Sequence, residues 1–128
     1  MARFWNTSDF LKTAAIQWGI DNEDNAIRDL ENQLGGEITR CGLFISKSHQ
    51  FIGASPDGIY QDSLIEVKCP FILRDAEPTD FSNLNRQQRG SFCSSLTAAG
   101  TLKLKKNHKY YGQIMTQMWV TGYKKTIF

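Results

Sequence analysis

The sequence predicts a mixed α/β fold (α+β mixed), in which a central mixed sheet is flanked by helices. Three observations predict it: two helical patterns come first, three short strand patterns follow, and a last helical pattern precedes the start of a further strand. The chain has 128 residues, of which 41% are apolar and 22% charged, as in an ordinary globular domain with a modest core. We therefore expect a single domain over residues 1–128.

Two helices are expected in the N-terminal part of the chain. Phe10, Ala14 and Trp18 recur at a spacing of four residues, which places them on one helix face, and Gly19 interrupts this pattern. Asp21 follows as the cap of a second helix. Apolar side chains share one face of that helix, and two glycines end it: Ile27, Leu30, Leu34 and Gly35-Gly36.

Three short strands are expected next, over residues 38–45, 51–55 and 64–68. Residues 47–49 form the first turn, and residues 61–63 form a hairpin turn before the third strand. Because a strand has a period of two, residues two apart on the third strand project from the same face.

The remaining chain divides into a polar segment and a helix. Residues 74–108 are polar and weakly periodic, so we expect a mobile loop with room for a short helix around residues 80–89. Apolar residues then recur every four positions over residues 109–121, which predicts a helix, and Gly122 ends it. The strand that begins at residues 125–128 stops almost at once, so we expect the domain to be truncated.

Composition excludes several classes of protein. No run of about 18 apolar residues exists, and the N-terminus lacks a secretory apolar stretch, so we expect an intracellular, cytoplasmic protein without a membrane segment. The three cysteines have no CxxC spacing and no histidine partners nearby, which argues against a disulfide framework or a zinc site.

Charge is divided unevenly along the chain. Residues 1–74 carry seven basic and ten acidic residues, whereas residues 75–128 carry eight basic and three acidic ones. This division suits a metal site beside a surface that binds phosphates, and it suits a solvated basic tail equally well.

The third strand and the turn before it hold the residues with the clearest chemistry. Asp57 ends one strand, and Glu66 and Lys68 share one face of the next, so pairing across the hairpin brings the two carboxylates together. Two carboxylates repel unless a cation neutralises them, and oxygen ligands select Mg²⁺ or Mn²⁺. Lys68 then faces the same pocket, where it stabilises a phosphate or positions a water, as phosphodiester hydrolysis requires. The alternative is a surface hairpin with a common Glu-x-Lys pair, although the apolar flanks of the strand favour burial.

Four blocks of sequence follow one another along the chain: WG…ExxA at residues 18–26, GASPDG at 53–58, IEVKCPF at 65–71 and YGQIMTQMWVTG at 111–122. In this order they resemble the lambda exonuclease and YqaJ-type viral recombinase (alkaline exonuclease) family of the PD-(D/E)xK nuclease superfamily. The resemblance implies a restriction-endonuclease-like fold and an origin in a phage-type gene acting in the host cell cytoplasm.

The resemblance also implies roles for individual residues. Asp57, Glu66 and the carbonyl of Val67 would bind the metal, and Glu23 would complete its environment. Lys68 would be the catalytic lysine, and Gln113 would face the site from the late helix. Ser55 would bind a 5′ phosphate, and the DNA backbone would contact Gln117 and the basic residues Arg86, Arg89, Lys103, Lys105, Lys106 and Lys109.

The sequence departs from the family at two places. Members often have a second glutamine where this chain has Met115, although Gln117 lies one turn from Gln113 and shares its face. Members also begin with a longer segment that grips the DNA end, and only 17 residues precede Trp18 here.

The function that the resemblance implies is Mg²⁺-dependent exonuclease activity on linear duplex DNA, from 5′ to 3′, in phage-type recombination. A single-strand annealing protein and a homotrimer are the partners that it implies. The departures leave two alternatives, a catalytically impaired remnant that binds DNA ends and an endonuclease of the same superfamily. Under the exonuclease hypothesis, the carboxylates of Glu23, Asp57 and Glu66 should converge with Lys68 facing them.

Overall fold

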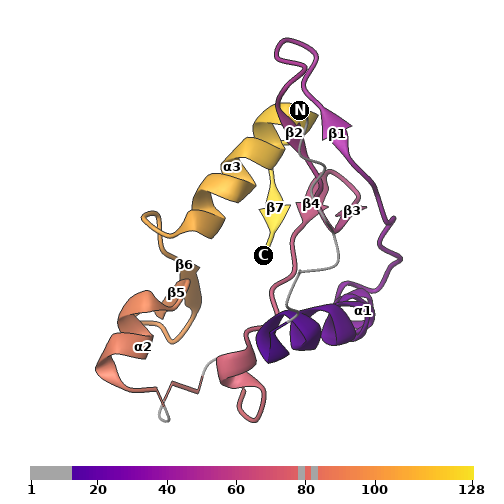
Figure 1. Cartoon of the computed structure of the whole chain (residues 1–128). Helices are drawn as coiled ribbons and strands as arrows, with labels where there is room; N and C mark the ends of the chain where they lie inside the picture. The colour runs from indigo at the N-terminus through magenta and orange to yellow at the C-terminus, as the bar shows by residue number, and fades with distance from the viewer. Residues whose placement is uncertain (1–12, 78–79, 82–83) are drawn as a thin grey trace, which may run out of the picture.

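The computed structural model describes residues 13–77, 80–81 and 84–128. Figure 1 shows a long helix, α1, at one end of a small central sheet, a second long helix, α3, beside that sheet, and a lobe of short elements beyond the start of α3. The elements follow in the order α1 (Ala14–Leu34), β1 (Phe44–Ile45), β2 (Gly53–Ala54), β3 (Gly58–Tyr60), β4 (Ser63–Ile65), η2 (Phe71–Leu73), α2 (Arg86–Ser91), β5 (Ser94–Leu96), β6 (Leu102–Leu104), α3 (Lys109–Thr121) and β7 (Thr126–Ile127).

Helix α1 is continuous, so the expectation of two helices divided at Gly19 is wrong. Thr13 caps it by accepting a hydrogen bond from the Ile16 amide at 3.2 Å. The helix ends where expected, because Gly35 adopts the left-handed conformation with φ of 69°. A single glycine costs a helix only about 1 kcal/mol, which packing along the rest of the helix offsets. Phe10, the first residue of the expected pattern, lies outside the described residues.

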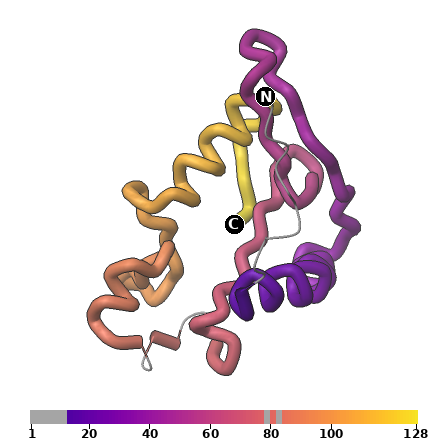
Figure 2. The backbone as a smooth tube through the Cα atoms, in the orientation of Figure 1, coloured from indigo at the N-terminus to yellow at the C-terminus, as the bar shows by residue number. Residues whose placement is uncertain are grey.

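The central sheet is mixed, as the sequence predicts. Strand β3 pairs antiparallel with β4, and Gly58 lies opposite Ile65. Strand β4 pairs parallel with β7, and Leu64 lies opposite Thr126. A parallel pair needs a crossover, which the segment containing α3 provides. Figure 2 shows the C-terminal segment returning alongside the chain that leaves β4.

Two further strand pairs flank this sheet. Strands β1 and β2 form an antiparallel hairpin against which α3 packs. The expected first strand over residues 38–45 is therefore short, and its early part contributes only an isolated bridge between Thr39 and Ile59. The hydrogen bonds of that bridge measure 2.8 and 2.9 Å and hold the segment against β3.

The core lies between α1 and the central sheet. Its buried centre is formed by Ile27, Ile38 and Ile65, and the side chains packed around it are Leu30, Leu34, Tyr60, Val67 and Ile127. The Tyr60 hydroxyl donates a hydrogen bond to the Leu34 carbonyl at 3.0 Å, which ties the end of α1 to β3. Because Ile65 is fully buried, it anchors the main chain at the point where residues 66–68 begin.

Residues 74–108, expected as a polar loop, contain α2 and the β5–β6 hairpin. Helix α2 begins at Arg86, later than the expected start near residue 80, because Asn85 and Gln88 form a reciprocal capping box. The Lys105 amide donates to the Cys93 carbonyl at 2.8 Å and extends the hairpin ladder. Across the described part of the chain, no helix combines the length and apolar character needed to cross a membrane.

Candidate active site

Glu66 is a buried carboxylate with three side-chain donors. It follows β4 directly and is only 2% exposed. Its Oε1 accepts hydrogen bonds from Lys68 Nζ and from Gln113 Nε2 at 2.6 Å. Its Oε2 accepts one from Gln117 Nε2 at 2.7 Å. Burying an ionised carboxylate is expensive unless it is paired and hydrogen-bonded, and these donors meet that requirement. The Glu66–Lys68 pair is therefore not the exposed pair of a surface hairpin.

Lys68 lies between this carboxylate and an aromatic ring. Its ammonium pairs with Glu66 and stands 5.1 Å from the centroid of the Tyr110 ring. The ring in turn contacts His108, with centroids 4.6 Å apart, and Phe128. A cation over a ring face is attracted by its quadrupole, so Tyr110 restricts where the lysine amine can go.

Asp57 reaches the same segment from the neighbouring strand. Its Oδ2 accepts a hydrogen bond from the Val67 amide at 2.6 Å, and its own amide donates to the Ile65 carbonyl at 3.0 Å. Gly58 follows it, and a Cβ there would lie 2.5 Å from Cγ2 of Ile38, so glycine lets residues 38–39 pack closely against β3. The hairpin register thus places Asp57 beside the main chain that carries Glu66.

The acids of the site affect one another electrostatically. The pKa of Asp57 is raised above its ordinary value, chiefly by burial and further by the negative charges of Glu66 and Glu23. The hydrogen bond from Val67 and the charge of Lys68 act in the opposite direction. Negative charge is therefore concentrated around Asp57, and one lysine offsets only part of it.

Arg40 joins two of these acids, and its role was missed from the sequence. Its guanidinium bonds to Glu23 Oε1 at 3.1 Å and to the Asp57 carbonyl at 3.3 Å, and it also pairs with Asp24. It therefore bridges α1 to the turn that carries Asp57. The only available signal was that Arg40 is the sole basic residue within residues 29–46.

The oxygen donors of the site suit a hard divalent cation. The carboxylates of Asp57 and Glu66 and the Val67 carbonyl lie on adjoining segments. The pKa of Asp57 is raised mainly by burial and further by the neighbouring acids, and a bound cation would oppose both effects. The expected convergence of three carboxylates is not present: in residues 13–77, 80–81 and 84–128, no group of three or more His, Cys, Asp or Glu side chains is arranged to hold a metal. Glu23 is instead directed to Arg40.

Helix α3 carries its two glutamines four residues apart, whereas members of the family often have the second one at the position of Met115. Gln113 and Gln117 lie four residues apart and share the helix face toward Glu66. Met115, at the position where the family often has glutamine, is 46% exposed. Gln117 is 2% exposed, so it supports Glu66 from within and does not form the DNA-facing surface expected of it.

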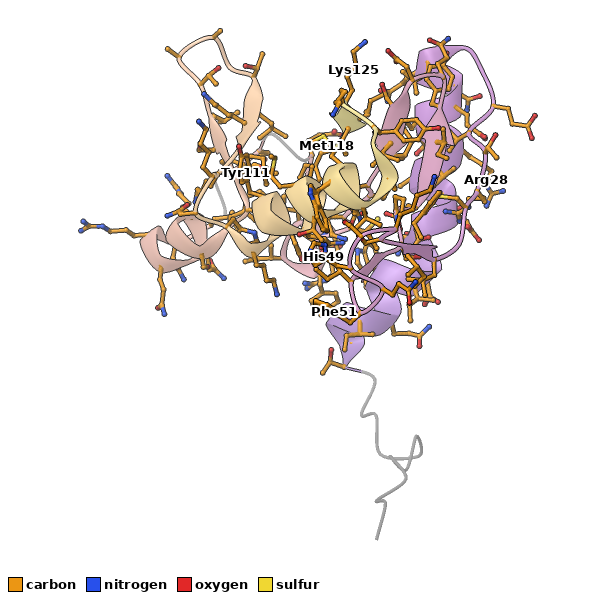
Figure 3. All side chains as sticks on the ribbon, turned by 90° about the horizontal axis from the view of Figure 1, so that it is seen from above. Arg28, His49, Phe51, Tyr111, Met118 and Lys125 are labelled. Carbon is orange, nitrogen blue, oxygen red and sulfur yellow. The ribbon has the colours of Figure 1, made fainter. Side chains whose placement is uncertain are left out.

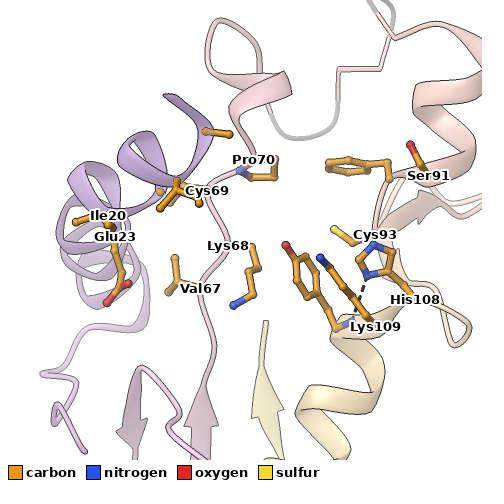
Figure 4. A pocket seen from close by; sticks show the side chains of 15 residues that line it. Ile20, Glu23, Val67, Lys68, Cys69, Pro70, Ser91, Cys93, His108 and Lys109 are labelled. Atoms are coloured by element: carbon orange, nitrogen blue, oxygen red, sulfur yellow. Dashed lines mark hydrogen bonds between the residues drawn. The ribbon is translucent and has the colours of Figure 1, made fainter. Parts of the chain in front are cut away.

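A cavity of about 480 Å³ opens beside Lys68. Figure 4 shows Lys68 between Glu23 on α1 and the beginning of α3, where His108 and Lys109 lie. The polar side chains that line the cavity include Glu23, Lys68, Cys69, Ser91, His108 and Lys109. Burial raises the pKa of the Cys69 thiol, as do the charges of Glu23 and Asp57, which keeps this cysteine protonated.

The other predicted DNA-contact residues lie in the β2–β3 link or in the segment with α2, β5 and β6, and no described hydrogen bond joins them to Glu66. Ser55 is exposed in the link between β2 and β3. Arg89 Nε donates to the Leu84 carbonyl at 2.7 Å, and Lys105 Nζ donates to the carbonyls of Arg89 and Gly90 at 2.7 and 3.0 Å, so both side chains hold the α2 lobe together. The side chains of the remaining three are exposed on that lobe: Arg86, Lys103 and Lys106.

The fold and the site together define a class of protein. A mixed sheet flanked by helices, with an Asp and a Glu-x-Lys at the ends of adjacent strands, is the arrangement of the restriction-endonuclease-like fold. The chain belongs to the family of the YqaJ-like viral recombinase domain, whose model matches residues 2–124. The family resemblance predicted from the four sequence blocks is thus confirmed.

Solved structures agree with this assignment. The chain is similar to the crystal structure of an alkaline exonuclease (LHK-Exo) from Laribacter hongkongensis, with 29% identity, a TM-score of 0.57, and coverage of 86% of this chain and 46% of that one. It is equally similar to LHK-Exo in complex with dAMP, with 28% identity, a TM-score of 0.59, and coverage of 87% and 46%. The chain therefore spans about half the length of that exonuclease. None of the curated proteins matches the sequence.

Proposed function

We propose that this chain is a metal-dependent deoxyribonuclease domain, spanning residues 1–128, that hydrolyses phosphodiester bonds of linear duplex DNA as an exonuclease. The observation that carries the proposal is the buried Glu66, held by Lys68, Gln113 and Gln117 beside Asp57. A buried and paired carboxylate contributes less to stability than apolar residues of similar volume would, so its presence beside a second acid supports a functional site. The likeness to an alkaline exonuclease, one structure of which holds the deoxynucleotide dAMP, supports the same class of substrate.

The proposed mechanism assigns a task to each side chain. Asp57, Glu66 and the Val67 carbonyl would hold Mg²⁺, for which Mn²⁺ could substitute, and Glu23 would join them after leaving Arg40. When bound, the metal supplies charge stabilisation to the phosphate under attack. Lys68 would orient the attacking water, and its ammonium would stabilise negative charge on the phosphate.

Other residues position the reacting groups. Gln113 and Gln117 fix the orientation of the Glu66 carboxylate, so it requires little rearrangement when substrate binds. Lys109 lines the cavity beside Lys68 and would contact a phosphate near the site. Ser55 would bind the 5′ phosphate, and Arg86, Lys103 and Lys106 would contact the DNA backbone without reading its sequence.

The biological setting is part of the proposal. Family membership supports degradation of one strand from its 5′ end in phage-type recombination. A single-strand annealing protein would then receive the exposed strand. Assembly of the nuclease as a homotrimer is proposed on the same ground.

The test is nucleotide release from linear, 5′-phosphorylated duplex DNA in Mg²⁺, with EDTA as the reference. The unmodified protein should release mononucleotides, and Lys68→Ala and Asp57→Asn should each reduce the rate by about 10²–10⁴-fold, as removal of a group that acts in the transition state does. Lys124→Ala is the matched control, because it removes an exposed lysine that has no part in the proposed site or DNA contacts. Equal rates in all four proteins, or no release by any, would reject the proposal.

A second candidate is a protein that binds DNA ends without cutting them. The pairing of Glu23 with Arg40 favours it, since the described acids do not form a three-carboxylate metal site. This candidate predicts retention of a labelled duplex on a filter in EDTA and no nucleotide release in Mg²⁺. Cleavage of covalently closed circles would indicate an endonuclease instead.

A further inference from the structure

We propose that His49, Phe51 and Trp119 form a stacking platform for the unpaired bases of a single-stranded nucleic acid. The platform joins the β1–β2 hairpin to α3. The His49 and Phe51 ring centroids lie 5.8 Å apart and the rings are perpendicular, whereas His49 and Trp119 lie 5.5 Å apart with an interplanar angle of 47°. Figure 3 shows His49 close to α3 and Phe51 farther out.

The rings of the platform are open to solvent. Phe51 is 86% exposed and Trp119 is 53% exposed, so their contacts with His49 leave both rings open to solvent. The turn that carries His49 and Phe51 is fixed by hydrogen bonds, because the His49 amide donates to Ser46 Oγ at 3.2 Å and the Ile52 amide donates to the His49 carbonyl at 2.8 Å. Exposed aromatic faces on a fixed turn are what base stacking requires, since every base presents a π face.

The charge of the surrounding chain favours a polyanion as the occupant. Residues 38–56, which include the hairpin, contain no Asp or Glu, and neither do residues 81–128, which include α3. Lys47 lies in the same turn, is exposed, and forms no ion pair with any residue that the structure describes. A second copy of the chain would bring another acid-free face against this one, whereas a nucleic-acid strand would bring phosphates.

The platform is separate from the Glu66 site. Trp119 is two residues from Gln117, which places it about 200° around α3 from the face that supports Glu66. A strand lying on the platform would therefore not be the one at the Glu66 carboxylate. The identity of the ligand as nucleic acid rests on the proposed nuclease function.

The test compares two oligonucleotides that share a backbone and differ in bases. Binding of fluorescein-labelled oligo(dT) and of the same length of abasic oligonucleotide is measured by anisotropy in EDTA, with the unmodified chain, Phe51→Ala, Trp119→Ala and the control Ile72→Ala, which shortens an exposed side chain on η2. The unmodified chain should bind oligo(dT) about 5- to 100-fold more tightly than the abasic strand, the range expected of stacking on an aromatic ring. Phe51→Ala and Trp119→Ala should remove most of that difference, and Ile72→Ala should keep it.

Each contrary result has a distinct meaning. Equal affinity of the unmodified chain for the two oligonucleotides would overturn the platform. So would unchanged base preference in both variants, or a change in oligomeric state by light scattering with no change in DNA affinity, which would make this face a protein interface. Failure of nucleotide release in Mg²⁺ rejects the nuclease proposal and leaves this binding measurement, made without Mg²⁺, intact.

Discussion

Replacing Gln117 by Met tests whether the Glu66 carboxylate depends on its buried amide donor. Methionine keeps the length and approximate volume of glutamine and removes the donor that reaches Glu66 Oε2 at 2.7 Å. Both side chains are 2% exposed, so water cannot replace the lost hydrogen bond. Loss of a hydrogen bond to a charged and buried group should lower the free energy of unfolding by about 2–3 kcal/mol.

Gln113→Met is the matched control, because it removes the same kind of donor from the same carboxylate. Gln113 is exposed, and Oε1, to which it donates, also accepts from Lys68. Water can therefore take its place, and the expected loss is only about 0.5–1 kcal/mol. Urea denaturation at pH 7 in EDTA, followed by circular dichroism, gives both values. An equal loss in the free energy of unfolding for Gln113→Met and Gln117→Met would show that burial does not set the strength of these hydrogen bonds.

Three further substitutions test other parts of the site. Tyr110→Leu should lower nucleotide release by about 3- to 10-fold because the ring no longer restrains Lys68, while Tyr110→Phe keeps the rate; equal rates for both would exclude a role for the ring. Asp57→Asn should raise the melting temperature at pH 7 in EDTA. Because the folded-state pKa of Asp57 is raised, the native protein binds the proton more tightly, and stability falls as pH rises from the ordinary value of 3.8 through that pKa. The advantage of Asp57→Asn should therefore vanish in melts below pH 3.8, and a difference that is constant with pH contradicts this. Gly58→Ala should lower the free energy of unfolding by about 1–3 kcal/mol in urea titrations, since its Cβ would meet Ile38, and a neutral effect would show that the hairpin can shift.

Local contacts explain what the sequence could predict about the site. Asp57 and Glu66 directly flank the β3–β4 hairpin, so its short turn was enough to bring them together. Strand β4 ends at Ile65, however, and not at Lys68 as the sequence predicted. The helix over residues 109–121 was also local, because its apolar residues repeat every four positions and Gly122 ends it. These features depend on residues close in the chain.

Packing between distant segments explains what the sequence could not predict. The continuity of α1 through Gly19 depends on the burial of Ile27 and the packing of its neighbours, which outweigh a weak local preference. The parallel pairing of β4 with β7 joins segments about 60 residues apart. The rotation of α3 about its axis decides that Gln117 is buried on Glu66 while Met115 is exposed, and helical periodicity alone does not fix that rotation.

The hydrogen bonds around Glu66 and Asp57 leave some of their carboxylate oxygens able to bind a cation. Oε1 of Glu66 already accepts two donors, whereas Oε2 accepts one, and Asp57 uses Oδ2 to accept from Val67. A carboxylate oxygen has two lone pairs, so Oε2 of Glu66 and Oδ1 of Asp57 retain acceptor capacity within the described contacts. Both acids are held in place by groups that a cation need not displace. The proposed site also requires the release of Glu23 from Arg40, and that exposed ion pair is weak enough to be exchanged for a stronger one with a divalent cation.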